Sequence, residues 1–327
     1  MNLNRLPKIL QHVHLDGSVR IETANELLNK DVSSEMMIDE NCKSLSDYLT
    51  KFKIPISLMQ TKDNLIRVSY ELGIDLLNQN VIYVEVRFCP LFHINEGLSL
   101  EEVVDSILKG LNQSGIKFNL ILCMMREFSY EKNKQIINLA NKYLNKGVCA
   151  IDLAGDEGSY PTKNYRNLFE LASSLNIPFT IHAGEADGCE SISSAIEFGA
   201  KRIGHGVRTI EYIDLINEIR EKNITLEVCP TSNIDTMVYS NYKEHPIKKL
   251  YDLGVKVTIN TDNNTVSNIS LNKEYEKLKN VFNFKVSDFI KMNIDAINSC
   301  FISDKEKKEL ILKYRKEVQN EGFNYGS

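Results

Sequence analysis

The strongest constraint on the fold comes from residues 8–18, whose sequence is KILQHVHLDGS. An apolar run leads into two histidines two positions apart. Alternate residues of a β-strand share one face, so His12 and His14 would project together about 6.6 Å apart, close enough to bind one metal ion. The following DGS has turn and cap chemistry, which places the pair at the carboxyl end of the strand, where α/β proteins build their sites. A lone pair of this kind is more often two ordinary core or surface histidines, so the rest of the chain has to decide.

Apolar, β-branched runs alternate with amphipathic segments along the whole chain. We predict eight strands, at residues 9–14, 81–88, 118–125, 148–153, 177–182, 202–204, 224–228 and 255–260. Helical patterns lie between them, for example at residues 64–78, 100–111, 130–145, 165–175, 191–198, 212–221 and 245–253. This alternation predicts an α/β fold, a parallel (β/α)8 TIM barrel with its catalytic groups at the carboxyl ends of the strands. No linker, low-complexity block or repeat divides residues 1–327, so we expect a single domain.

Two segments depart from the alternation. Residues 21–58 form a long connection after the first strand, and its apolar residues recur at helical spacing: Leu45, Tyr48, Leu49 and Phe52. We predict a helical insertion there, either a lid over the barrel mouth or a packing element without a gating role. Residues 286–321 predict extra C-terminal helices, and their run DKEKKELILKYRKE is typical of a solvated amphipathic helix.

Composition and charge exclude several classes of protein. The net charge is −5, with basic residues interleaved among acidic ones, which disfavours binding to nucleic acid or to an anionic membrane. The N-terminal residues lack the apolar segment of a signal peptide, and no apolar run approaches the roughly 18 residues of a membrane span. The seven cysteines are scattered without a C-x-x-C pair, as expected of buried thiols in a reducing cytoplasm. We therefore expect a globular cytoplasmic protein, monomeric or weakly homo-oligomeric.

Polar residues collect where the later predicted strands end. His182 and Glu185 follow the fifth strand in IHAGE, and His205 stands between two glycines after the sixth. Asp262 follows the eighth strand in INTDN. Four of the six histidines and one aspartate thus occupy carboxyl ends of strands, which scattered core histidines would rarely do, so the set indicates a metal site. The two remaining histidines lie before or within helical segments and are expected on the surface: His93 and His245.

A plausible set of metal ligands follows from these positions: His12, His14, His182 and Asp262. Imidazole nitrogens with one carboxylate suit zinc, and cobalt or iron would also fit. A position left for water would make the ion catalytic, because the pKa of a bound water falls from 15.7 to about 7.

Glu185 and His205 each have two interpretations. Glu185 can protonate a substrate and shuttle the proton afterwards, or it can orient the ring of His182 as a neighbouring carboxylate. His205 can polarise the activated water or stabilise a developing alkoxide, or it can be a fourth histidine ligand.

Seven short motifs occur in order along the chain: HVHLDGS, YVEVR, AIDLAGDE, HAGE, RIGHG, EVCPTSN and INTDN. In these motifs the chain resembles the adenosine deaminase family of metal-dependent aminohydrolases, over about residues 7–318. The resemblance implies a barrel that holds one zinc ion (Zn2+). It also implies that hydroxide adds to C6 of the purine in adenosine or 2′-deoxyadenosine and that ammonia leaves.

The resemblance also implies a role for each matching residue. The implied metal ligands are His12, His14, His182 and Asp262. Glu185 would be the proton donor to the purine ring nitrogen, and His205 would orient the attacking hydroxide. Gly155 would offer its backbone N–H to purine N3, and Asp16 would meet the ribose 5′ hydroxyl. Without the resemblance, these last two are a loop glycine and a helix cap.

Asn263 departs from the family pattern, which often has a second aspartate there, facing purine N7. An asparagine amide can donate a hydrogen bond to N7, which is an acceptor, so purine binding survives the change. The substrate preference is less well determined, since adenine deaminases and deaminases of other 6-aminopurine nucleosides share most of these motifs. A nucleoside-binding protein that kept the fold without the chemistry is a further alternative.

Two other classes of hydrolase lack the residues they need. Zinc enzymes of the cytidine deaminase type use H-x-E followed by P-C-x-x-C, and this chain has only Cys229-Pro230, in the reverse order. Binuclear amidohydrolases commonly use a modified lysine after the fourth strand, where this chain has DLAG at residues 152–155. A site with one metal ion is therefore favoured.

Overall fold

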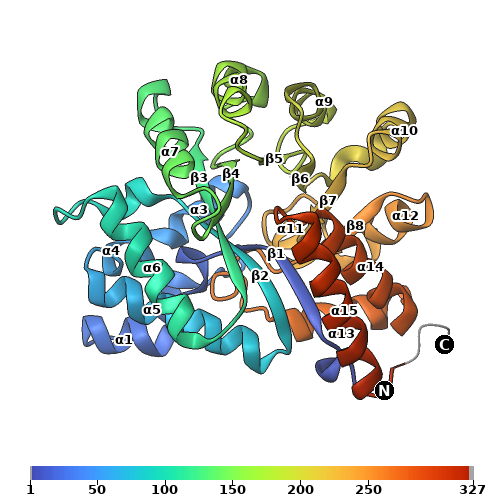
Figure 1. Ribbon diagram of the computed structural model, residues 1–327, viewed down its shortest axis with the longest axis horizontal. Coiled ribbons are helices and arrows are strands. Elements are labelled where there is room, and N and C mark those ends of the chain that lie inside the picture. The colour runs from blue at the N-terminus through green and yellow to red at the C-terminus, as the bar shows by residue number, and fades with distance from the viewer. Residues whose placement is uncertain (1, 324–327) are drawn as a thin grey trace.

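Parallel strands form the centre of the protein, and the computed structural model describes residues 2–323 (Figure 1). The strands are β1 (Lys8–His14), β2 (Val81–Phe88), β3 (Phe118–Met125), β4 (Val148–Ala154), β5 (Thr180–Ala183), β6 (Arg202–His205), β7 (Thr225–Val228) and β8 (Lys256–Ile259). All eight predicted strands are present. The fifth begins later than predicted, at Thr180, because Pro178 has no N–H to donate to a ladder, and only Phe179 forms a bridge there, to Ile151.

The strands form two four-stranded sheets, β1-β2-β3-β4 and β5-β6-β7-β8, that are joined at two seams. At one seam Ile151 of β4 bridges to Phe179, just before β5. At the other, Val13 of β1 bridges to Asp262, just after β8. The predicted TIM barrel is confirmed, with a single bridge in place of a continuous ladder at each seam. The second seam brings the first motif of the chain beside the last.

Helices surround the strands (Figure 1). They are α1 (Ile21–Leu28), α2 (Ser33–Met36), α3 (Leu45–Leu49), α4 (Lys53–Leu58), α5 (Lys62–Asn78), α6 (Leu100–Ser114), α7 (Tyr130–Tyr143), α8 (Arg166–Ser174), α9 (Cys189–Phe198), α10 (Ile213–Glu221), α11 (Pro230–Asp235), α12 (Ile247–Asp252), α13 (Leu271–Phe282), α14 (Val286–Ser299) and α15 (Asp304–Asn320). Local sequence explains their ends. For example, α6 starts with a capping box of Ser99 and Glu102 and stops at Gly115, whose φ of 80° favours glycine.

Both departures from the alternation are helical, as predicted. The insertion after β1 contains α1 to α4, and the C-terminal segment contains α14 and α15. Helix α14 packs against β8 and β1, where the Ile9 N–H donates to Asn293 Oδ1 at 2.8 Å. Helix α15 buries one apolar stripe, formed by Leu310, Tyr314 and Val318. Helix α14 therefore helps to cover the seam between β1 and β8, and α15 packs against α14.

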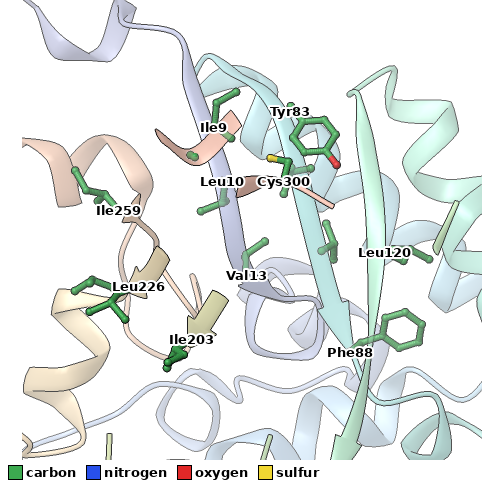
Figure 2. Close-up of a cluster of buried hydrophobic side chains, with 14 of the residues drawn as sticks. Ile9, Leu10, Val13, Tyr83, Phe88, Leu120, Ile203, Leu226, Ile259 and Cys300 are labelled. Atoms are coloured by element: carbon green, nitrogen blue, oxygen red, sulfur yellow. The ribbon is translucent and has the colours of Figure 1, made fainter. Parts of the chain in front are cut away.

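The strands bury apolar side chains on both faces, as expected of a parallel barrel ringed by helices. Figure 2 shows one cluster of such side chains, contributed by β1, β2, β3, β6, β7 and β8: Ile9, Leu10, Val13, Tyr83, Phe88, Leu120, Ile203, Leu226 and Ile259. Each of these is at most 2% exposed. Burial of a large aliphatic side chain contributes roughly 1.5–3 kcal/mol, so this core provides the main stabilisation of the fold.

Five fully buried charged side chains interrupt this core: Glu85, Arg87, Asp152, Arg202 and Glu227. Arg87 lies 2.8 Å from Asp152 Oδ2 and 2.8 Å from Glu227 Oε2. Arg202 Nε lies 2.6 Å from Glu227 Oε1, and Arg202 also pairs with Glu85. Buried charges persist only when they are paired and hydrogen-bonded, and here each charge has at least one opposite partner.

Both histidines that we expected on the surface are buried, so that prediction was wrong. His93 ends the 3₁₀ helix η4 (Pro90–His93) and has no exposed area, and its ring lies 6.1 Å from that of Phe88. His245 is 2% exposed, and both of its ring nitrogens have hydrogen-bond partners. Helical spacing did not show that these short connections fold inward against the barrel.

The cysteines fit the sequence expectation more closely. All seven are free thiols, six of them buried and Cys189 half-buried. Over residues 2–323, no helix combines the length and the apolar character needed to cross a membrane.

The buried charge network yields a prediction about stability. Replacing Arg202 with methionine (Arg202→Met) removes one cation and leaves Glu85 and Glu227 buried without it. We expect a loss of about 3–5 kcal/mol in the free energy of unfolding, measured as a lower denaturant midpoint. The control is Lys222→Ala, which breaks an exposed ion pair with Glu218 and should cost no more than about 1 kcal/mol. Equal midpoints for the two variants would contradict the role of the network.

Candidate metal centre and substrate cavity

Three polar side chains meet at the seam between β1 and β8. The Asp262 N–H donates to the carbonyl oxygen of His12 (3.1 Å), and the His14 N–H donates to the carbonyl oxygen of Asp262 (2.7 Å). Asp262 has a φ of 61°, a left-handed conformation that is costly for a non-glycine residue and typical of functional sites. This pairing places Asp262 Oδ1 3.3 Å from the Nε2 atoms of both His12 and His14.

His182, on β5, completes a cluster of four residues. Its Nε2 lies 3.3 Å from His14 Nε2, and the four residues offer ligand atoms that all lie within 4.8 Å of one another. Two ligand atoms that each lie about 2.0 Å from one tetrahedral ion are about 3.3 Å apart, which matches these separations. The Nε2 atom of His12 is buried without a hydrogen-bond partner. The structure thus brings the four sequence-predicted ligand residues together in an arrangement that fits a metal ion.

Buried carboxylates lie behind two of the histidine rings. Glu227 Oε2 is 3.0 Å from His12 Nδ1, and Asp152 Oδ2 is 2.9 Å from His182 Nδ1, the second at an angle outside that of a regular hydrogen bond. A carboxylate at Nδ1 keeps the proton there and leaves the Nε2 lone pair for a metal ion. Burial alone would raise the pKa of Asp152, but His182 and Arg87 outweigh burial and hold that pKa well below its usual value.

A second group of residues could also hold a metal ion: His12, His205, Cys229 and Asp262, whose ligand atoms lie within 4.8 Å of one another. Burial raises the pKa of the Cys229 thiol well above its usual value. The thiol also donates a hydrogen bond to the carbonyl oxygen of Glu227 at 3.5 Å, so it already has a partner within the protein. The group with three histidines is the better candidate.

Glu185 and His205 lie next to each other beside the cluster. Glu185 Oε2 is 3.5 Å from His205 Nε2, which is 4.0 Å from Asp262 Oδ2. Burial raises the pKa of Glu185 well above its usual value, and the negative charge of Asp262 adds to the shift, so the surroundings favour the protonated carboxyl. Asp152 lies at the Nδ1 side of His182, which favours the interpretation of Glu185 as a proton donor over that of an orienting carboxylate.

Glu157 fixes the loop that carries Glu185. The Glu157 carboxylate accepts four backbone hydrogen bonds, from the N–H groups of Gly184 (2.7 Å), Glu185 (2.9 Å), Ala186 (2.8 Å) and Asp187 (3.1 Å). Hydrogen bonds to a buried carboxylate are about twice as strong as those between neutral groups. Glu157 therefore holds residues 184–187 in one conformation.

Sequence reasoning missed three acidic residues of this site: Asp152, Glu157 and Glu227. All three stand inside motifs of the chain, and a signal was available for two of them. Asp152 and Glu227 lie within the strands VCAIDLA and TLEV, where a buried charge needs a specific partner. Glu157 stands in a polar loop, where nothing local distinguishes it from a solvated residue.

A cavity of about 150 Å³ adjoins the cluster. The insertion supplies one wall through its side chains Leu45, Tyr48, Leu49, Phe52 and Ile56. The three sequence-predicted substrate residues, Asp16, Gly155 and Asn263, also line it. Burial raises the pKa of Asp16 to about 7. Gly155 has a φ of 100°, and a Cβ there would lie 2.4 Å from Glu127 Oε2, so only glycine fits.

The lining of this cavity contains several carboxyl groups. Four of the described lining residues are acidic, namely Asp16, Glu127, Glu185 and Asp262. No lysine or arginine is among the described lining residues. An anionic group placed next to an ionised carboxylate such as Asp16 would meet a like charge without a lysine or arginine to offset it, which costs several kcal/mol.

A larger cavity of about 650 Å³ lies elsewhere, next to the amino ends of the strands, and its lining includes Cys149, Thr225 and Lys256. It contains none of the sequence-predicted site residues. Since active sites of barrels of this type form at the carboxyl ends of the strands, the smaller cavity is the candidate functional site.

The chain is similar to known proteins over nearly its whole length. The family model described as "Adenosine deaminase" matches residues 7–317. A relative from Clostridium perfringens named "Adenosine deaminase" is 41% identical over 328 residues, covering 95% of this chain and 99% of the relative. A relative of the same name from Clostridium acetobutylicum is 42% identical over 94% of this chain and 97% of its own length.

Solved structures show the same fold at lower identity. The adenine deaminase from Arthrobacter aurescens is 21% identical and covers 96% of this chain and 99% of its own, with a TM-score of 0.84. The Arabidopsis protein ADAL, solved in complex with IMP, is 24% identical and covers 98% of this chain and 99% of its own, with a TM-score of 0.88. An amidohydrolase from Burkholderia ambifaria, solved with bound Zn, is 21% identical and covers 98% of this chain and 92% of its own, with a TM-score of 0.89.

The four-residue cluster predicts that metal binding depends on His12. In His12→Ala, the zinc affinity should fall by more than about 100-fold, because one ligand and the contact to Glu227 are both lost. The measurement is zinc per chain after dialysis against a buffered zinc concentration. The control is His93→Gln, since His93 is equally buried but lies outside the cluster and should keep its zinc. Full zinc content in folded His12→Ala would contradict the ligand role.

The contacts of Glu157 predict that it restrains the loop. In Glu157→Gln, one acceptor oxygen becomes an NH2 group that faces backbone donors, so the amides of residues 184–187 should exchange hydrogen about 10- to 100-fold faster. Hydrogen exchange followed by mass spectrometry measures this directly. Asp156→Asn is the control, since Asp156 contacts Ser159 and should leave the exchange of the loop unchanged. Unchanged exchange in Glu157→Gln would show that the loop is held by other contacts.

Proposed function

Because the chain belongs to the adenosine deaminase family, we propose that it is a zinc-dependent enzyme that hydrolyses adenosine to inosine and ammonia, and 2′-deoxyadenosine to 2′-deoxyinosine and ammonia. The observation that carries the proposal is the four-residue ligand cluster beside buried Glu185, on a cavity whose described lining contains no lysine or arginine. The same chemistry on adenine, or on another 6-aminopurine nucleoside, is the second candidate.

Zinc would be held by His12, His14, His182 and Asp262, the residues whose ligand atoms the fold brings together. A bound zinc ion supplies Lewis-acid chemistry, which makes water a competent nucleophile at neutral pH. The carboxylates behind His12 and His182 keep those two rings in the tautomer that presents Nε2.

Glu185 and His205 perform the proton chemistry. When the oxygen of water bonds to purine C6, electrons move to the adjacent ring nitrogen, and protonated Glu185 donates its proton to that nitrogen. His205 Nε2, next to Glu185, orients the attacking oxygen. As a carbonyl forms at C6, the C6–N bond of the amino group breaks. Of the two protons that the water loses, one leaves with ammonia and the other returns to Glu185, while the ring nitrogen keeps the proton that Glu185 donated. The overall reaction converts water and adenosine to inosine and ammonia, and it balances in atoms and charge.

Three further residues bind the nucleoside. The Gly155 N–H donates to purine N3, the Asn263 amide donates to N7, and Asp16 meets the 5′ hydroxyl of the ribose. The positions of all three on the cavity wall support these roles. The apolar wall from the insertion then covers the remaining surface of the substrate, either as a fixed element or as a lid that closes on it.

The charge of the cavity favours a nucleoside over a nucleotide. A 5′ phosphate would have to approach Asp16, and no lysine or arginine among the described lining residues compensates for it. ADAL, which was solved with IMP, shares the fold, but its likeness to this chain extends only to the fold. Adenine alone would leave Asp16 without the ribose hydroxyl that we assign to it.

We also propose a cytoplasmic location, which the seven free cysteines support.

The test is ammonia release from adenosine, 2′-deoxyadenosine, AMP and adenine, measured with native protein, with metal-stripped protein and with stripped protein reloaded with zinc. We expect turnover of both nucleosides, at least about 100-fold faster than that of AMP because of the acidic cavity. The activity should vanish on stripping and return with zinc. Turnover of adenine alone would move the protein to base deamination, and a preference for AMP would refute the argument from charge. No turnover of any of the four by the zinc-loaded protein would refute the proposal.

A further inference from the structure

A buried chain of hydrogen bonds leads from His205 away from the site. Asn233, on α11, has its Nδ2 3.0 Å from His205 Nδ1, and its Oδ1 3.2 Å from His245 Nε2. The Ile247 N–H, at the start of α12, donates to His245 Nδ1 at 3.2 Å. His205, Asn233 and His245 are all at most 2% exposed. The hydrogen bonds reach the ligand cluster through His205, whose Nε2 lies 4.0 Å from Asp262 Oδ2.

The Ile247 N–H determines the donor and the acceptor of every hydrogen bond in this series. A backbone N–H can only donate, so His245 Nδ1 must be an acceptor and the proton of His245 must lie on Nε2. That proton is donated to the Asn233 oxygen, which orients the amide so that its NH2 group faces His205. Nδ1 of His205 must then accept, and the proton of its ring lies on Nε2. Burial lowers the pKa of His245 to about 3, which agrees with the neutral ring that the geometry requires.

The Nε2 atom of His205 points to the reaction site. It is buried, has no hydrogen-bond partner, and lies 3.5 Å from Glu185 Oε2 and 4.0 Å from Asp262 Oδ2. A buried donor without a partner is costly unless a ligand supplies the acceptor. The acceptor that fits here is the oxygen that attacks the substrate.

We propose that Asn233 and His245 are positioning residues that fix the tautomer of His205, so that His205 meets the attacking oxygen as a hydrogen-bond donor and not as a metal ligand. The expected effect on catalysis rests on the proposed function. The tautomer of His205 does not, because it depends on the protein alone. It also selects between the two interpretations of His205, since a protonated Nε2 has no lone pair for a metal ion. His245 acts only through Asn233.

Three variants separate this role from simple packing. Asn233→Leu keeps the volume and removes the donor to His205, so kcat should fall about 10- to 100-fold while KM and zinc content stay near those of the native protein. His245→Phe removes the group that orients the Asn233 amide and should lower kcat by less. His245→Gln, which can still donate to the Asn233 oxygen, should restore most of the kcat lost in His245→Phe.

The double variant gives the sharpest kinetic test. If His245 acts through Asn233, adding His245→Phe to Asn233→Leu should change kcat no further, whereas two independent packing defects would multiply. Multiplying effects would overturn the proposal, as would native kcat in a folded Asn233→Leu. If Asn233→Leu does not fold, the pair His245→Phe and His245→Gln decides, and equal kcat for these two would overturn the proposal.

A direct measurement does not depend on turnover. Long-range 1H–15N correlations of zinc-loaded protein labelled with [15N]histidine report which ring nitrogen carries the proton, and the signals of His205 are those missing in His205→Ala. In the native protein we expect the proton of His205 on Nε2 and none on Nδ1. In Asn233→Leu we expect that the ring no longer has this one tautomer alone. A protonated Nδ1 in the native protein would overturn the proposal, whether or not any purine is deaminated. Failure of the proposed function would appear only in the assays of ammonia release.

Discussion

The Glu227 carboxylate is the contact on which the rest of the structure depends. Its two oxygens touch Arg87, Arg202 and the Nδ1 of His12, all of them fully buried. Burial alone would raise the pKa of Glu227, but the two arginines and His12 outweigh burial and keep it ionised. One carboxylate thus balances the cations of the barrel interior and also sets the tautomer of a histidine in the candidate metal centre. Core stability and the metal site are therefore coupled through a single residue.

The same arrangement recurs around the site. A buried group holds each functional side chain or its loop from behind: Asp152 holds His182, Glu157 holds the loop of Glu185, and Asn233 holds His205. Two functional residues, Asp262 and His205, also have positive φ angles of 61° and 59°, which a non-glycine residue adopts only when its surroundings enforce it. The fold therefore stores strain at the site and offsets it with the hydrogen bonds and packing behind it.

Much of the fold followed from local patterns. Apolar runs located all eight strands because parallel strands are buried on both faces, and the polar strand ends indicated the candidate site because barrels of this type carry their active sites at the carboxyl ends of the strands. The errors were of one kind. His93 and His245 were expected on the surface because spacing along the chain does not show which short segments pack inward. The start of β5 was placed too early because apolar spacing takes no account of Pro178, which has no N–H for a ladder. Asp152 and Glu227 were missed for a related reason, since their importance lies in partners far away in the sequence.

By itself, the sequence determined the barrel, the family, and the identity of the residues that meet at its mouth, because periodicity and residue type are local properties that every residue carries. The tertiary structure alone decided how those residues are oriented. The hydrogen bonds across the β1–β8 seam set Asp262 against His12 and His14, and the link from His245 through Asn233 assigns the proton of His205. Distances and donor directions between residues far apart in the chain exist only once the barrel has closed.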